Sequence, residues 1–437
     1  MQLLTKRKAL LIGNRAFFNT TARRIFTSLS FRHYRKYAAG TFVMNLGTWM
    51  NRIAQDWLIL ELTGSGVALG IITGMQFAPA IFLSFIGGNL GDRYNKKIIM
   101  AICSGMIGIS GLTLATIVYA NFQTVSIVYL FALVVGIFTA IDMPIRHSLM
   151  SDLVGEKNVA NAVSLNSVNF NLARIIGPAT AGITVSVLGV PSALILSGVA
   201  YSVFTFMIST TKSSRLNTES SHLEAQLNFF STLKFIWGNK AIGMALSMVA
   251  ALAFFGLNFQ ITTALMAVNV FGLGAAGYGL LSSTTAIGAL IGGLISAHRY
   301  SRIADIRLAG TGLIFGFTQI GAGLSPNIQY YSAMLALSGF SALLTTIAAN
   351  SLIQENTPYL IRGKVLGIYT VVFSGSMAIG GPSVGYMADL YGPQPTLILG
   401  GSAVVGISVL IIILRFRLEG LRKIWKDGIL KTKPINY

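Results

Sequence analysis

The first polar pattern in the sequence lies within an apolar stretch that is long enough to cross a lipid bilayer as a helix. Asn45, Thr48, Arg52 and Asp56 follow one another at helical intervals, so they share one face of that helix. A charge near the membrane centre costs about 2.5–3.5 kcal/mol on insertion scales, and such residues usually face a cavity and carry function. We therefore assign Asn45, Arg52 and Asp56 to a substrate or proton pathway.

Two hypotheses for Asp56 stay open. Arg52 lies one helical turn before it, so the two side chains are expected to pair. In the first hypothesis Asp56 is a proton-coupling carboxylate, whose protonation depends on Arg52 and on burial. In the second, Arg52 and Asp56 form an interfacial ion pair that closes an external gate.

A second arginine, Arg174, also lies within an apolar stretch and shares a helix face with Asn171. No acidic residue accompanies it on that helix, so we expect it to hold an anionic group of a substrate or to meet a partner such as Asp56. The alternative is that its side chain extends to the cytoplasmic surface of the membrane. Asn171 and Arg174 complete the predicted substrate or proton pathway.

The elements that must position these side chains are membrane-spanning helices. Hydrophobic residues make up 53% of the 437 residues and charged residues only 10%, whereas soluble domains contain about 25% charged residues. The apolar residues come in runs of about 20, and in hydrocarbon a helix satisfies every backbone N–H and C=O within such a run. We predict an all-α polytopic membrane protein with spans at 37–60, 67–87, 98–119, 125–143, 164–186, 191–209, 242–265, 277–296, 307–324, 330–350, 365–386 and 395–414.

The net charge of +19 is explained by where the 32 lysines and arginines lie. Apart from Arg52 and Arg174, all of them precede the first span, follow an even-numbered span or lie in the C-terminal tail. Loops on the cytoplasmic side of a membrane retain Lys and Arg, so this alternation predicts twelve spans with both termini in the cytoplasm. The charge needs no nucleic-acid partner, and the lipid bilayer is the expected environment.

The two halves of the sequence resemble each other. The segment 177–182 in the fifth span recurs as 381–385 in the eleventh, and the segment 92–96 has a weaker counterpart in 298–302. Two parallel repeats joined by a cytoplasmic linker are typical of transporters built from two pseudo-symmetric six-helix bundles. We divide the chain into a basic cytoplasmic segment (1–36), an N-terminal bundle (37–210), a linker (211–240), a C-terminal bundle (241–415) and a basic cytoplasmic tail (416–437).

The loop after the second span resembles the motif of a known family. The residues Gly88-Asn89-Leu90-Gly91-Asp92-Arg93-Tyr94-Asn95-Lys96-Lys97 resemble the motif that the major facilitator superfamily carries there, and they depart from it at Asn95. The stretch 49–65 and the motif Asp142-x-Pro144-x-Arg146 resemble the branch that contains the enterobactin exporter and related drug-efflux permeases. The resemblance covers residues 37–415.

The resemblance implies a cytoplasmic gate built from Gly88, Asp92, Arg93, Asp142 and Arg146. It places Asp92 at the N-terminus of the eleventh span, where the helix dipole and free N–H groups favour an anion. It joins Arg93 and Arg146 to one charge network with Asp142, while Gly88 allows neighbouring backbones to approach closely. The alternative for the basic residues of this loop is that they only set the topology.

Glycine and proline mark a second motif. Proline removes one helical hydrogen bond and glycine admits close packing, so Gly177 and Pro178 predict a kink in the fifth span. They resemble the superfamily's antiporter motif, which implies exchange and efflux. With them we group Gly182, Gly381 and Pro382 as helix-kink residues, although the last two are also explained as a packing repeat.

The sequence contains no catalytic constellation. Its few acids and four histidines lie almost all in loops, without metal-ligand spacing, and no Walker A motif is present. The segment 272–277 matches G-x-G-x-x-G, but it lies in a predicted external loop with no preceding strand. We therefore predict no enzymatic activity, no metal and no cofactor.

We predict a monomeric secondary active transporter of the bacterial inner membrane. It would export a small amphipathic molecule, such as a drug or a siderophore-like compound, with protons as the coupling ion. The nearest alternative is an importer of a nutrient or metabolite on the same fold. A channel or a non-transporting membrane scaffold is more remote, because the intramembrane charges occupy two helices and form no continuous polar stripe.

Overall fold

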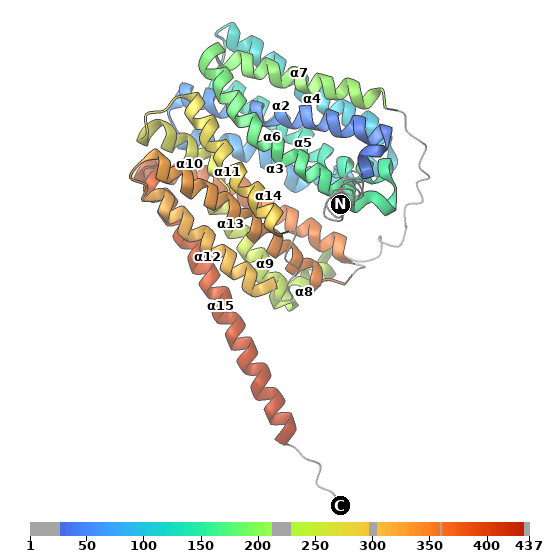
Figure 1. Ribbon diagram of the computed structural model, residues 1–437, viewed down its shortest axis with the longest axis vertical. Coiled ribbons are helices and arrows are strands. Elements are labelled where there is room, and N and C mark those ends of the chain that lie inside the picture. The colour runs from blue at the N-terminus through green and yellow to red at the C-terminus, as the bar shows by residue number, and fades with distance from the viewer. Residues whose placement is uncertain (1–26, 212–228, 297–303, 359–360, 432–437) are drawn as a thin grey trace, which may run out of the picture.

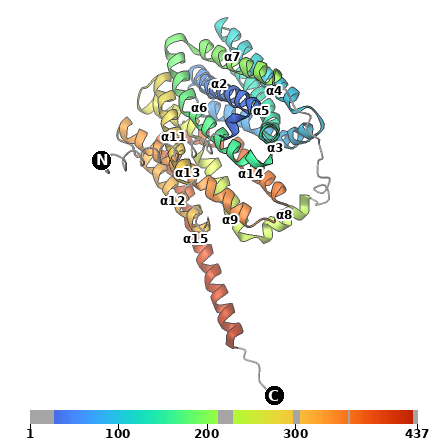
Figure 2. The same cartoon turned by 45° about the vertical axis from the view of Figure 1, so that its right-hand side comes forward.

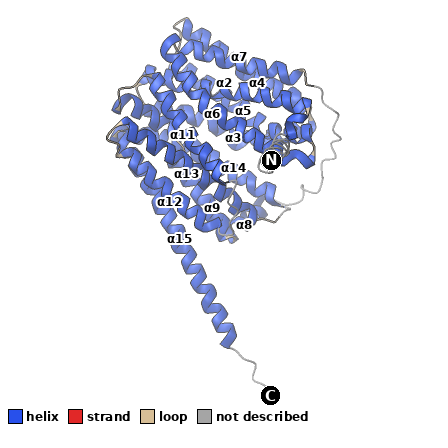
Figure 3. Ribbon diagram, in the orientation of Figure 1, coloured by secondary structure: helices blue, strands red, loops and turns tan. Residues whose placement is uncertain are grey.

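The computed structural model is almost entirely helical (Figure 3). It describes residues 27–211, 229–296, 304–358 and 361–431, and no strand occurs in these ranges. The sequence predictions that fall outside them concern residues 1–26, 212–228, 298–302 and 432–437.

Each of the first six predicted spans lies within one long helix. These are α2 (Arg32–Thr63), α3 (Gly66–Arg93), α4 (Lys96–Tyr119), α5 (Val125–Val154), α6 (Val159–Leu188) and α7 (Val190–Ser209). Short 3-10 turns, η1 (Thr27–Ser30) and η2 (Glu156–Asn158), precede α2 and α6. Helices α2, α3, α5 and α6 extend past the predicted spans, mainly at the predicted cytoplasmic end, because a helix continues after its apolar run leaves the bilayer.

Among the described residues, the second half contains one short helix and five long helices, besides the segment of the seventh predicted span. They are α8 (Phe229–Gly238), α11 (Ala275–Ser296), α12 (Ala304–Gly323), α13 (Ile328–Glu355), α14 (Arg362–Tyr391) and α15 (Pro393–Lys431). The eighth to twelfth predicted spans coincide with α11 to α15 within one residue or lie inside them. Helix α15 continues well past the predicted end of the twelfth span and projects from the rest of the molecule (Figure 1).

The seventh predicted span, 242–265, is not one regular α-helix. It consists of α9 (Lys240–Ala251), the π-helical turn η4 (Leu252–Gly256), α10 (Phe259–Leu265) and the π-helical turn η5 (Met266–Val270). The side-chain amide of Asn258 donates to the carbonyl oxygens of Ala253 and Phe254, at 3.3 and 2.6 Å. An asparagine that competes for backbone carbonyls in this way disturbs the regular helical pattern. The segment Lys240–Val270 as a whole is still long and apolar enough to cross a membrane, as the sequence predicts for this span.

Ten helical segments of the described ranges are long and apolar enough to cross a membrane. The other two long helices, α2 and α12, lie at the first and ninth predicted spans and carry more polar residues. Buried polar side chains such as Asn45, Asn51 and Gln55 lie on α2. The twelve-span architecture is therefore consistent with the helices, while the sidedness of the termini stays a prediction.

Helices α2 to α7 pack on one another, and α9 to α15 form a second group (Figures 1 and 2). Within the first group α2 packs against α6 and α7, and within the second α12 packs against α13 and α15. The two groups meet mainly through α3 against α14 and through α6 against α11. Side chains on these four helices and on α2 and α10 are therefore the ones that a movement between the groups would affect.

Glycines end two helices at corresponding positions of the two halves. Gly189 (φ +81°) joins α6 to α7, and Gly392 (φ +87°) joins α14 to α15. A positive φ favours glycine. The first turn of a helix tolerates proline, because the backbone N–H that proline lacks would have no partner within the helix there. Pro191 and Pro393 occupy those turns, so each tight turn follows directly from its sequence.

Candidate functional site

Asp56 lies deep inside the molecule and bonds to the opposite half. It is 2% exposed, and the phenol of Tyr278 in α11 donates a 2.9 Å hydrogen bond to its Oδ2. Arg52 and Asp56, both in the described part of the chain, do not form an ion pair within 4.0 Å. The expected pairing along α2 is thus replaced by a hydrogen bond to Asp56 from another helix.

Both intramembrane arginines lie against the same tryptophan. The guanidinium carbon of Arg52 is 5.2 Å from the centroid of the Trp49 ring, and that of Arg174 is 5.7 Å from it. Arg52 also lies over Phe77 of α3, at 5.3 Å. Aromatic faces attract cations, which offsets part of the cost of holding two like charges close together away from bulk water.

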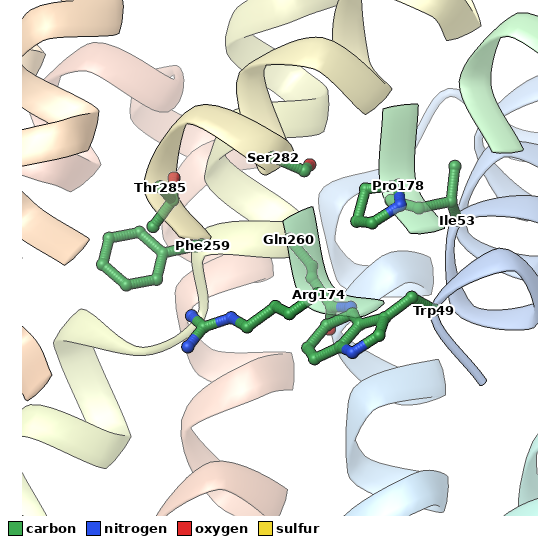
Figure 4. A pocket seen from close by; sticks show the side chains of 8 residues that line it. All are labelled: Trp49, Ile53, Arg174, Pro178, Phe259, Gln260, Ser282 and Thr285. Carbon is green, nitrogen blue, oxygen red and sulfur yellow. The ribbon is translucent and has the colours of Figure 1, made fainter. Parts of the chain in front are cut away.

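Arg174 reaches into a small cavity between the two helix groups. The cavity has a volume of about 40 Å³, and its lining comes from α2, α6, α10 and α11. In Figure 4 the Arg174 side chain extends across it, with Trp49 and Phe259 to either side. The other lining residues are Ile53, Pro178, Gln260, Ser282 and Thr285. A space of about 10–15 Å³ is enough for one water molecule, whereas drug-sized ligands occupy pockets of about 300–1,000 Å³. The cavity therefore holds a small polar group and not a whole drug-sized molecule.

Several polar atoms of this lining have no hydrogen-bond partner within the described ranges. Trp49 Nε1 and Gln260 Nε2 are buried without a hydrogen bond. Arg174 forms neither an ion pair nor a hydrogen bond with a described residue. Buried donors are normally bonded, so unpaired ones indicate a place for a ligand or an ordered water.

The two predicted asparagines do not reach the cavity lining. Asn45 is buried in α2. Asn171 donates from its amide to the carbonyl oxygen of Ser167 in its own helix, at 2.8 Å. The structure therefore brings Arg52 and Arg174 together and leaves Asn45 and Asn171 apart from them.

The residues of the predicted cytoplasmic gate separate into two sets. Asp142 is buried and forms an ion pair with Arg146, one turn later on α5. Asp92 and Arg93 lie exposed in the last turn of α3, and neither makes a hydrogen bond or ion pair with a described residue. A Cβ added to Gly88 would have no neighbour within 4 Å. The predicted network is thus formed by Asp142 and Arg146 alone in this structure.

The helix-kink residues of α6 lie where neighbouring helices come closest. A Cβ added to Gly177 would lie 2.6 Å from Cβ of Trp49. One added to Gly182 would lie 3.0 Å from Cα of Gly279 in α11. Helix α6 continues through Pro178. These glycines therefore allow close approach, and Gly182 does so between the two helix groups.

Gly381 and Pro382 lie in the contact between α14 and α3. A Cβ added to Gly381 would lie 2.8 Å from the carbonyl oxygen of Gly70. One added to Gly70 would lie 2.3 Å from the carbonyl oxygen of Gly381 and 2.6 Å from Cα of Pro382. Close approach of small residues is a common way for membrane helices to associate.

The surface of α3 that contacts α14 was not predicted from the sequence. Gly66, Gly70 and Gly74 recur every fourth residue and face α14. This small-x-x-x-small spacing is a known packing pattern and was visible in the sequence. Tyr278 and Gln260 were also missed, and no local pattern distinguishes them from other residues of apolar helices.

A carboxylate from α14 caps the start of α3, and it too was missed. Oδ1 of Asp389 accepts a 2.5 Å hydrogen bond from the backbone N–H of Gly66. Its Oδ2 accepts from the N–H of Val67 at 3.0 Å and from the hydroxyl of Ser65 at 2.6 Å. We call these four residues the Asp389 contact. An anion at a helix N-terminus satisfies free N–H groups and interacts favourably with the helix dipole.

The comparisons with known proteins agree with this fold. A model of the family described as transmembrane secretion effector matches residues 25–427. The staphyloferrin A transporter of Staphylococcus aureus is 23% identical over 389 residues, which are 88% of this chain and 96% of that protein. The enterobactin exporter of Citrobacter koseri is 23% identical over 383 residues, 87% of each chain.

A solved structure shares the architecture. It is a bacterial homologue of the human lysosomal transporter Spinster, with a TM-score of 0.67 and 16% sequence identity, covering 87% of this chain and 95% of that one. The predicted all-helical architecture and the resemblance to the major facilitator superfamily are confirmed. The chain is a multi-pass membrane protein, and it belongs to the transmembrane secretion effector family of major facilitator transporters.

Proposed function

We propose that this chain exports a small amphipathic molecule of the drug or siderophore class in exchange for protons. Two relatives support the substrate class, since one is named for staphyloferrin A and the other for enterobactin. The second name also states export. Transport would proceed by alternating access, as the bundles 37–210 and 241–415 move about the linker 211–240.

The buried hydrogen bond between Asp56 and Tyr278 carries the proposal of proton coupling. It joins α2 to α11 and therefore joins the two helix groups. An ionised carboxylate only accepts hydrogen bonds, whereas a protonated one also donates. Loss or gain of one proton at Asp56 therefore changes the bond to Tyr278, and by linkage it changes the balance between conformations.

The other predicted residues take roles around this pair. Arg52 and Arg174 would attract the substrate, and Asn45 and Asn171 would line its path. Gly88, Asp92, Arg93, Asp142 and Arg146 would close the cytoplasmic side in the opposite conformation. We further propose that the protein acts as a monomer in the bacterial inner membrane, with both termini in the cytoplasm.

Proton movement in inside-out vesicles tests the proposal. The vesicles are energised to an acidic interior, and a pH-sensitive dye follows the gradient while compounds are added from outside. Lipophilic cations, common antibiotics and catecholate siderophores form the panel. We expect at least one compound to dissipate the gradient with the wild-type protein and not with Asp56→Asn, because the amide cannot carry the proton.

Glu61→Gln is the matched control. Glu61 is an exposed carboxylate on the same helix and accepts a hydrogen bond only from Trp57 of that helix within the described part of the chain. This variant should keep the wild-type response. A response that survives in Asp56→Asn would remove Asp56 from coupling, and a response lost equally in Glu61→Gln would show a general effect of removing carboxylates from α2.

A further inference from the structure

The cavity around Arg174 is built to receive an acceptor of hydrogen bonds. Its polar lining offers the Arg174 guanidinium, Trp49 Nε1 and Gln260 Nε2, all without a hydrogen-bond partner within the described ranges. None of the eight lining residues is acidic. A group that bonds to all three must bring its own oxygens, and a negative charge would also offset the repulsion between the two guanidinium groups at Trp49.

We infer that this cavity binds the carboxylate group of an aromatic or otherwise apolar substrate. The lining supplies apolar surfaces beside the donors, namely Trp49, Ile53, Pro178 and Phe259. At about 40 Å³ the cavity accommodates the charged group while the body of the molecule lies outside it. The inference rests on the proposed transport function and adds to it the chemistry of the recognised group.

The walls of the cavity come from both helix groups. Trp49 and Arg174 lie on α2 and α6, whereas Gln260 and Ser282 lie on α10 and α11. A carboxylate between them would contact both halves at once. Its binding would therefore depend on how closely α6 and α11 approach, which is what a transporter needs to couple binding to a change of conformation.

Binding of 1-naphthoate to the purified full-length protein in nanodiscs tests the inference without a proton gradient. Isothermal titration calorimetry compares it with 1-naphthamide, which has a similar ring and shape but no charge. We expect naphthoate to bind about tenfold or more tightly than naphthamide, as a charge-assisted hydrogen bond would give. The preference should disappear in Arg174→Gln and weaken in Gln260→Leu.

Lys234→Gln serves as the control, since it removes an exposed positive charge on α8, away from the cavity. This variant should keep the wild-type preference. Equal binding of both probes, no binding of naphthoate, or an unchanged preference in Arg174→Gln would overturn the inference. If naphthoate binds as expected and the vesicles show no proton exchange, only the proposed coupling fails.

The Asp389 contact supports a second, independent inference. It joins the C-terminal end of α14 to the N-terminus of α3, and these helices belong to different groups. The predicted external loops contain neither lysine nor arginine, so the positive end of α3 is the cationic partner that the sequence provides near Asp389. Without the Asp389 carboxylate, three donors at the start of α3 would lose their acceptor.

The geometry assigns to Asp389 the role of holding the two groups together at this end. The start of α14 offers a contrast, because Ile361 at its N-cap provides no side-chain hydrogen bond. The family resemblance predicts Asp92, at the end of α3, as the partner of that N-terminus. Asp389 of α14 would then cap the start of α3, and Asp92 of α3 would cap the start of α14. Of these two contacts, the structure contains the Asp389 contact.

Distances between spin labels at Phe122 and Leu324 test this role. These residues are 75% and 65% exposed, and they lie in turns of different groups at the end of the molecule that carries Asp389. The labels are placed on the full-length protein in nanodiscs, with Cys103→Ala removing the native thiol. We expect Asp389→Asn to raise the ratio of long to short distances about tenfold, because a charged acceptor is lost.

Two further variants keep the test decisive. Ser65→Ala removes one of three donors and should raise the ratio about threefold. Glu61→Gln removes a carboxylate that bonds within α2 and should leave the ratio unchanged. An unchanged ratio in Asp389→Asn, or an equal rise in Glu61→Gln, would show that Asp389 does not hold the groups together.

Discussion

The two ends of α3 meet α14 in different ways. At the Gly66 end, a Cβ added to Gly66 would lie 2.8 Å from the carbonyl oxygen of Gly385, and one added to Gly70 would lie 2.3 Å from that of Gly381. At the Asp92 end, a Cβ added to Gly88 would have no neighbour within 4 Å. The same holds for the glycines at 363 and 367, near the start of α14. The helices therefore touch at one end and are separated at the other.

The difference shows that the two ends rely on different chemistry. The Gly66 end closes through backbone contact between small residues and through one carboxylate on a helix N-terminus. The Asp92 end carries exposed charges, which separate in water at low cost. Shape should thus control closure at the Gly66 end, and charge should contribute more at the Asp92 end.

Gly70→Leu should have the largest effect on the balance between conformations, because the leucine side chain would overlap the backbone atoms of Gly381 and Pro382. Overpacking of this kind costs about 1–3 kcal/mol, which shifts the equilibrium between conformations about 5- to 150-fold away from closure at the Gly66 end. Transport in vesicles should fall accordingly. The long distance between spin labels at Phe122 and Leu324 should become the most populated distance.

Gly406→Leu is the matched control for size. A Cβ at Gly406 in α15 meets nothing within 4 Å, so the same side chain should be accommodated there with transport close to wild type. Two results would contradict control by shape at the Gly66 end. One is wild-type transport and distances in Gly70→Leu, and the other is a loss of transport in Gly406→Leu as large as that in Gly70→Leu.

Gly88→Leu should act in the opposite direction. The side chain fits the present structure, since nothing lies within 4 Å of the added Cβ, but it would block any later approach of α14. We expect transport to fall several-fold while the Phe122–Leu324 distance stays short. A longer distance in this variant would mean that the Asp92 end does not close when the Gly66 end opens.

Asp92→Asn sharpens the comparison through charge alone. Asp92 has no hydrogen-bond or ion-pair partner among the described residues. The substitution should therefore leave the free energy of this conformation unchanged and destabilise only the conformation that is closed at the Asp92 end. A charged hydrogen bond contributes about 1.5–3 kcal/mol, reduced by exposure to water, so we expect a shift of about fivefold. Distance measurements between labels report it.

Asp152→Asn is the appropriate control for that experiment. Asp152 bonds to Lys96 at 2.7 Å, and both residues belong to the first helix group. Breaking this pair removes a carboxylate near the same end without altering a contact between groups. If Asp152→Asn shifted the distances as much as Asp92→Asn, the position of Asp92 would have no special role.

Much of this fold follows from the sequence. Apolar runs of the right length and the alternation of Lys and Arg between loops specify the helices, because the bilayer imposes both constraints locally. The break near Asn258 was not predictable in that way. Its cause is one amide that takes two backbone carbonyls, and the surrounding apolar run conceals it.

The candidate site was predicted only in part, for a related reason. Arg52, Asp56 and Arg174 stand out because charge is rare in a membrane helix. Their partners do not, since Tyr278 bonds to Asp56 across the interface between the helix groups and Trp49 is one of many aromatic residues. Local spacing suggested that Arg52 would pair with Asp56, but tertiary contacts placed each against another helix.

Gly74→Ala should give the smallest effect and defines where close contact between the helices ends. A Cβ at Gly74 would lie 3.1 Å from the carbonyl oxygen of Ala378 and 3.6 Å from Cγ of Pro382, between the tight fit at Gly70 and the open space at Gly88. Alanine favours a helix over glycine by about 1 kcal/mol, which offsets a small displacement of α14. We therefore expect thermal stability within a few degrees of wild type, measured by the reaction of a thiol dye with the buried Cys103. Gly88→Ala, which gains helix propensity and meets no neighbour, should be at least as stable as Gly74→Ala. The reverse order would show that contact between α3 and α14 does not weaken steadily from the Gly66 end to the Asp92 end.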